Sequence, residues 1–160
     1  MRPETDIKNI KKVAVLPFEN FTSDVYAGEK IRRIVITDLL EKGIDIIEPG
    51  EVTRQLQELK VKSIGSMKNT EIQGLGTALS VDALMMGAVE AFGLSKGISV
   101  TYPEVAVILR LIETDSGNII WSIRHTSGGP DFWMRHFGSE GPSLSETARK
   151  VVKEAVGTLF

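Results

Sequence analysis

The hydrophobic pattern of this chain changes its period along the sequence, and this change limits the folds that the chain can adopt. In the first half, short apolar runs at residues 13–18 and 44–47 alternate with segments whose apolar residues recur at helical spacing. In the second half, residues 98–113 and 118–125 are two extended segments that meet at the glycine-containing turn TDSGN. Strands that alternate with helices and then form a hairpin indicate a sheet of mixed strand direction.

Four segments carry the apolar stripe of a helix that packs on one face. The stripes consist of Ile31, Ile34, Val35 and Leu39, then Val52, Leu56 and Leu59, then Ile72, Leu75 and Leu79, and finally Ala148, Val151, Val152, Ala155 and Leu159. Gly43 stands where the first helix would end in a left-handed cap. Capping boxes are predicted from Thr70 to Gln73 and from Ser143 to Glu146.

The predicted fold is α/β: a mixed sheet with a parallel start and an antiparallel C-terminal meander, with helices packed on it, in the order β-α-β-α-α-β-β-β-α. Residues 81–93 show little alternation and are expected to form a central strand. In the hairpin, the row Val105 to Leu111 is expected to face the core under the terminal helix. Arg110 takes the other face, either in a buried ion pair or on a partly wet surface, and the wet surface is the more economical interpretation because unpaired burial of a charge is prohibitive. We expect one domain over residues 12–160, preceded by an N-terminal extension at 1–11.

Charge and composition exclude several classes of function. The net charge of −2 is spread over mixed signs, so the chain lacks the basic footprint of a nucleic-acid binder. The 160 residues contain no cysteine and two histidines, His125 and His136, at no metal-binding spacing. We therefore expect neither a metal nor a cofactor.

Residues 12–127 and the final helix resemble a group of bacterial envelope proteins. The segments that carry the resemblance are "KVAVLPFENFTSDVYAGEKIRRIVITDLLEKGIDIIEPGEV", "LGTALSVDALMMGAVEAFG" and "VAVILRLIETDSGNIIWSIRHTSG". The group includes the curli-secretion lipoprotein CsgG, the N-terminal domain of TolB and the lipoprotein activators of penicillin-binding proteins. The loops here are too short for the barrel hairpins of the curli channel, so pore formation is not implied.

The resemblance implies a non-enzymatic protein on the periplasmic side of the outer membrane. It implies action through other envelope proteins or further copies of the chain, and membrane attachment only through a lipid anchor. A lipid-bearing cysteine would have to lie upstream, because these residues contain none. The group also has a topology reminiscent of anticodon-binding domains, but the charge balance argues against nucleic acid.

The alternative function is a small-ligand-binding or enzymatic domain that uses the loop after the first strand. Open α/β sheets usually bind ligands there, and Glu19, Asn20 and Asp24 are its polar candidates. The same residue types also favour any strand-to-helix turn, with Ser23 or Asp24 as the cap. The glycines at 74–80 lie within a predicted helix, so they indicate close packing rather than a phosphate loop.

The stretch "PDFWMRHFG" at 130–138 holds three of the ten aromatic residues of the chain between glycine-rich flanks. One interpretation is a loop that folds back to close the core. The other is a contact surface, because aromatic residues, methionine and arginine are enriched where proteins meet. The candidate contact residues are Phe132, Trp133, Met134, Arg135 and Phe137.

Overall fold

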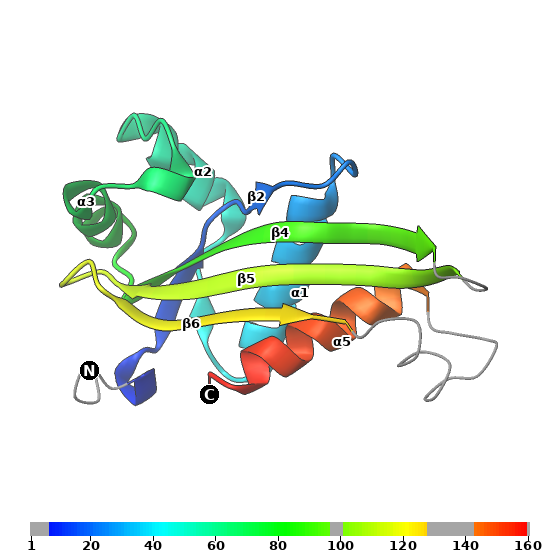
Figure 1. Ribbon diagram of the computed structural model, residues 1–160. Coiled ribbons are helices and arrows are strands. Elements are labelled where there is room, and N and C mark those ends of the chain that lie inside the picture. Colours follow the sequence, from blue (N-terminus) through cyan, green and yellow to red (C-terminus); the bar gives the residue numbers. More distant parts are fainter. Residues whose placement is uncertain (1–6, 97–100, 128–142, 160) are drawn as a thin grey trace.

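The computed structural model describes residues 7–96, 101–127 and 143–159. In chain order the elements are η1 (Ile7–Asn9), β1 (Lys12–Val15), β2 (Glu19–Asn20), α1 (Ala27–Glu41), β3 (Asp45–Ile46), α2 (Pro49–Glu58), η2 (Ile64–Ser66), α3 (Asn69–Leu79), β4 (Ala83–Lys96), β5 (Thr101–Glu113), β6 (Ile119–Thr126) and α5 (Leu144–Gly157). Figure 1 shows three long strands, β4 to β6, with α1 and α5 behind them and α2 and α3 gathered at one end.

A single mixed sheet confirms the predicted fold class. Its strand order is β3-β1-β4-β5-β6, and β2 pairs with β4 beyond the end of β1. The pairs β1–β3, β1–β4 and β2–β4 are parallel, whereas β4, β5 and β6 form an antiparallel meander. Strand β4 is central, as predicted, and a bulge between Val89 and Ala91 shifts its register with β5. The chain thus changes strand direction at β4.

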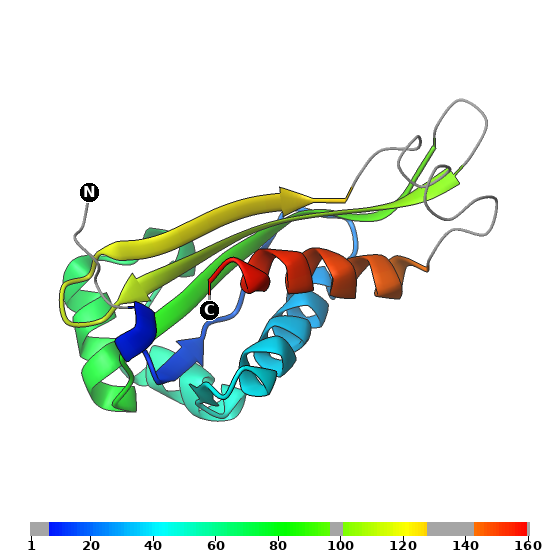
Figure 2. The same cartoon turned by 90° about the horizontal axis from the view of Figure 1, so that it is seen from below.

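Helices α1 and α5 cover one face of the sheet, which we call the covered face. Val105, Val107, Leu109 and Leu111 of β5 are fully buried there, in the same cluster as Val151 of α5. Figure 2 shows α1 and α5 together on one side of the long strands. The predicted facing of β5 is therefore confirmed. Ile10, which lies in the expected N-terminal extension, is also buried in this cluster.

A smaller core lies under α2 and α3, on the opposite face of the first part of the sheet. Ala14 of β1, Leu16 just after β1 and Leu84 of β4 point into it, and they alternate with residues that point to the covered face. Gly76 of α3 packs directly on Thr114, and a Cβ on Gly76 would collide with the Thr114 side chain. Gly74 and Gly76, the glycines at 74–80, thus lie within α3. Gly76 permits a close contact, as the sequence indicated, whereas a Cβ on Gly74 would meet nothing within 4 Å.

Beyond this smaller core, the same face of β4, β5 and β6 is not covered by any helix of the described residues, and we call it the open face (Figure 2). Arg110, Ser122 and Arg124 are exposed on it. Arg110 therefore reaches water, as expected. Among the described residues, no helix is long and apolar enough to cross a membrane.

The helix caps follow the predictions in part. Ser143 and Glu146 form the expected capping box at α5, and Gly43 adopts a positive φ of 83° after α1. Helix α3 instead starts at Asn69, because Glu71 accepts a hydrogen bond from the Lys68 backbone nitrogen at 2.9 Å. The box predicted at Thr70 was therefore wrong.

The remaining difference concerns the end of α2. Leu59 was predicted on the buried stripe of that helix, but it follows the last helical residue and is exposed. The stripe ends with Leu56, which packs in the smaller core.

Candidate functional site

The loop between β2 and α1, residues 21–26, is held together by its own polar side chains. Asn20 donates from Nδ2 to the Asp24 carbonyl at 2.7 Å. Its Oδ1 accepts from the Thr22 backbone nitrogen at 3.0 Å and from the Thr22 hydroxyl at 2.6 Å. The Thr22 hydroxyl also lies 3.2 Å from the Asp24 carbonyl. Asn20 thus fixes the loop from inside, in the manner of an Asx turn.

Asp24 joins this loop to α1. Its Oδ1 accepts from the Tyr26 backbone nitrogen at 2.8 Å, and its Oδ2 lies 2.9 Å from Lys30 Nζ. The hydrogen bond from Lys30, followed by that from Tyr26, lowers the pKa of the Asp24 carboxyl below its usual range. Lys30 Nζ also lies 5.3 Å from the centre of the Phe92 ring on β4. The loop is therefore fixed to a helix and to the central strand.

Three large apolar side chains point away from this frame into water. Phe21 is 67% exposed, Val25 79% and Tyr26 68%. We call Phe21, Val25 and Tyr26 the apolar loop surface. Burying a large apolar side chain contributes roughly 1.5–3 kcal/mol, and these three forgo most of that gain. Rigid, exposed aromatic groups are typical of surfaces that bind another protein.

The polar residues predicted for this loop have separate positions. Asn20 and Asp24 lie together and bond to the loop itself, whereas the Glu19 side chain lies against Gly65 of η2. Neither Ser23 nor Asp24 is the cap of α1, since the N-cap residue is Tyr26 and its side chain makes no capping bond. Asp24 instead acts two residues before the N-cap, by accepting a hydrogen bond from the Tyr26 backbone nitrogen.

The apolar loop surface was not predicted from the sequence, because the polar residue types of the turn are those expected to bind a ligand there. The available signal was the presence of Phe21, Val25 and Tyr26 in a segment that otherwise has turn composition. Polar residues at this position of an open α/β sheet are expected to contact a ligand. Here they form its frame, and the apolar residues between them face solvent.

Of the other predicted residues, His125 is the one that the structure describes. His125 of β6 lies 3.1 Å from Glu154 of α5, which leaves it in a partly exposed pair at the far edge of the sheet. His136 and the aromatic stretch with Phe132, Trp133, Met134, Arg135 and Phe137 lie outside the described residues. The interface role of that stretch stays a prediction.

Known proteins share the fold, although no protein-family profile and no curated protein sequence matches the chain. The PelC dodecamer from Paraburkholderia phytofirmans has 22% identity and a TM-score of 0.64, covering 93% of this chain and 86% of that one. Lipoprotein GNA1162 from Neisseria meningitidis has 18% identity and a TM-score of 0.66, covering 93% and 97%. The LpoB C-terminal domain from Salmonella enterica has 14% identity and a TM-score of 0.56, covering 74% and 83%.

At these identities the likeness shows the fold alone. It confirms the mixed α/β architecture and places the chain beside a protein that is itself described as a lipoprotein. The likeness to CsgG and to TolB stays a prediction.

Proposed function

We propose that this chain is a non-enzymatic envelope protein that acts by binding other proteins, including further copies of itself. The observation that carries the proposal is the apolar loop surface: three large side chains stand in water on a loop that is already ordered. A rigid loop loses little conformational freedom when a partner covers it, so more of the contact energy appears as affinity. The PelC neighbour, which is a dodecamer, supports self-assembly as one form of this contact.

The proposed location is the periplasmic side of the outer membrane, with attachment through a lipid on an upstream cysteine. Its support is the sequence resemblance together with the lipoprotein GNA1162 among proteins of this fold. Mass spectrometry of the protein isolated from native membranes tests it. A lipid-modified N-terminus is expected, and an unmodified N-terminus at Met1 would contradict it.

Sedimentation velocity across a concentration series tests the binding role. The double variant Phe21→Ser with Tyr26→Ser should sediment as a monomer, or lose capture of a purified partner, at concentrations where the wild type associates. Its melting temperature should stay close to that of the wild type, because both side chains are already in water. Leu40→Ser is the matched control, since Leu40 is 53% exposed on α1 outside the loop.

Equal association of wild type and double variant would contradict a role for this surface. If the wild type neither self-associates nor captures a partner through this loop, the proposed function itself fails.

A further inference from the structure

Strands β4, β5 and β6 carry charged side chains on the open face, and most of these side chains have polar partners. Arg124 of β6 donates from Nε to Glu90 of β4 at 2.8 Å, across the intervening strand. Ser95 donates its hydroxyl hydrogen to Glu104 at 2.7 Å. Arg110, in the middle of β5, differs: within residues 7–96, 101–127 and 143–159 its guanidinium has no hydrogen bond or ion pair. Within the same residues, the carboxylate of Glu19 on β2 also has no hydrogen bond or ion pair.

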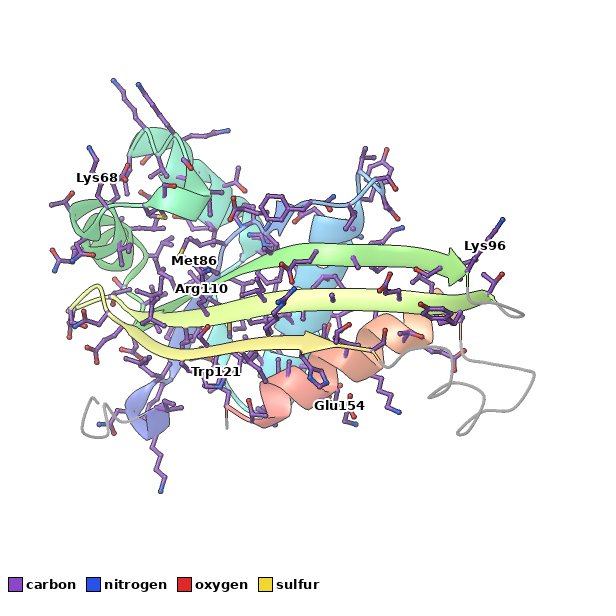
Figure 3. The ribbon with its side chains drawn as sticks, viewed as in Figure 1. Lys68, Met86, Lys96, Arg110, Trp121 and Glu154 are labelled. Carbon is purple, nitrogen blue, oxygen red and sulfur yellow. The ribbon has the colours of Figure 1, made fainter. Side chains whose placement is uncertain are left out.

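These two unpaired groups of opposite charge line the same pocket. It lies where η2 approaches the open face, and its volume is about 30 Å³. Met86 and Ala88 of β4 and Ile108 of β5 supply apolar walls between the charges. Met86 is the cross-strand partner of Arg110, and Figure 3 shows the two side by side near the end of the sheet that carries α2 and α3.

The two charges stand on strands separated by β4, and Gly65 of η2 leaves space for one of them. The Glu19 carboxylate lies directly on this glycine, and a Cβ there would stand 2.6 Å from Oε1 and closer still to Oε2. The absent side chain thus leaves room for the carboxylate at the η2 side of the pocket. Any larger residue would displace Glu19 from this position.

We propose that this pocket binds a small zwitterion, the chemical class of the free amino acids. Arg110 would receive the carboxylate, since a guanidinium binds it through two parallel hydrogen bonds. Glu19 would receive the ammonium group, and the apolar walls would contact the carbon atoms between the charges. About 10–15 Å³ holds one water molecule, so the pocket accommodates only a few heavy atoms of a ligand. The inference is independent of the apolar loop surface.

A ligand series measures both the need for two charges and their spacing. Glycine, β-alanine and γ-aminobutyrate carry the same charges at increasing separation, while acetate and ethylammonium each carry one. Glycylglycine represents a peptide with distant termini. Amide chemical shifts of Ala88 and Ile108 report binding by NMR. Binding on the order of millimolar is expected for one length of the series, since so few atoms are in contact.

Four variants test which side chains bind the ligand. Arg110→Gln and Glu19→Gln should each weaken binding about tenfold, because each removes one charge-assisted contact. Gly65→Ala should weaken it as well, since the added methyl group displaces the Glu19 carboxylate from its position beside η2 while both charges remain. Arg124→Gln, on the same face but outside the pocket, is the matched control and should bind like the wild type.

Three results would overturn the proposal. The first is equal binding of acetate or ethylammonium and the best zwitterion, because one charge would then suffice. The second is unchanged binding in Arg110→Gln, Glu19→Gln or Gly65→Ala. The third is an absence of shifts at Ala88 and Ile108 with every member of the series at about 50 mM, well above the millimolar range expected.

Discussion

Two regions of this molecule are ordered by opposite means. On the covered face of the sheet, apolar side chains such as Leu109 are fully buried under α1 and α5, and their burial supplies the order. In the β2–α1 loop, the apolar side chains of Phe21 and Tyr26 stand in water, and the hydrogen bonds that the Asn20 and Asp24 side chains make supply the order. The comparison shows that a segment held by polar bonds keeps its apolar groups available for a partner.

The largest effect is expected on the covered face. Leu109→Ala should lower the free energy of unfolding by about 2–5 kcal/mol, because it opens a cavity in the main core. Ile108→Ala is its matched control, since Ile108 is the preceding residue of β5 but points to the open face, where it is partly exposed. Urea denaturation measures both. A loss below about 1 kcal/mol for Leu109→Ala would show that burial on this face does not dominate stability.

Two glycines in α3, Gly74 and Gly76, test whether this helix packs closely against the sheet over the smaller core. Gly76→Ala should cost about 1–3 kcal/mol, since its methyl group would collide with Thr114. Gly74→Ala in the same helix meets nothing within 4 Å and should stabilise the protein by about 0.5–1 kcal/mol through helix propensity. Thermal unfolding compares the two. Equal effects would mean that α3 does not pack on Thr114 as described.

In the β2–α1 loop, the side chain that contributes most to stability should be the polar Asn20. Asn20→Ala removes the bonds to the Thr22 nitrogen and the Asp24 carbonyl and should cost about 1–2 kcal/mol. Asn20→Asp keeps the acceptor and loses the donor, so its unfolding free energy should fall between those of Asn20→Ala and the wild type. A neutral Asn20→Ala in urea denaturation would indicate that the loop is ordered by something other than these bonds.

The smallest effect concerns Asp38, in the groove between α1 and α5. Its Oδ2 is buried without a hydrogen-bond partner in the described structure, and burial, followed by the nearby Glu41, raises the pKa of this carboxyl. A raised folded-state pKa stabilises the protein only while the group is protonated, and this contribution is lost as the pH rises through that pKa. Asp38→Asn should therefore have a higher free energy of unfolding than the wild type at pH 7, by less than about 1 kcal/mol. Urea denaturation measures this difference, which should vanish near pH 3, where the carboxyl is protonated in both states. A difference in unfolding free energy that grows toward acid pH would contradict a raised pKa for Asp38.

Much of the fold could be predicted from local pattern. The alternation along β5 identified its buried row, and the TDSGN turn located the hairpin, because side-chain period and turn chemistry are local properties. Strand β2 could not be predicted in this way. It is two residues long, Glu19–Asn20, and it exists through backbone pairing with Ala88 and Val89, which lie far away in the sequence.

The sequence predicted a candidate site in the loop after the first strand, and the structure places exposed apolar side chains on the same loop. Sequence composition identified Asn20 and Asp24 as special, yet it could not show whether their oxygens would face a ligand or their own backbone. That choice depends on the docking of α1 against β4, through contacts such as Lys30 with Phe92. The presence of Glu19 and Arg110 at one pocket likewise depends on β2, β5 and η2 meeting at the open face.

Hydrogen exchange of the loop amides tests the central claim most directly, namely that the β2–α1 loop is ordered by its own polar bonds while its apolar side chains stay in water. The amides of Phe21, Thr22 and Tyr26 donate to the Val89 carbonyl, Asn20 Oδ1 and Asp24 Oδ1. In a dilute monomer these amides should exchange far more slowly than in an unstructured peptide, and Asn20→Ala should selectively release the Thr22 amide. Exchange of all three at the rate of a free peptide would contradict the account, because the loop would then have no order of its own.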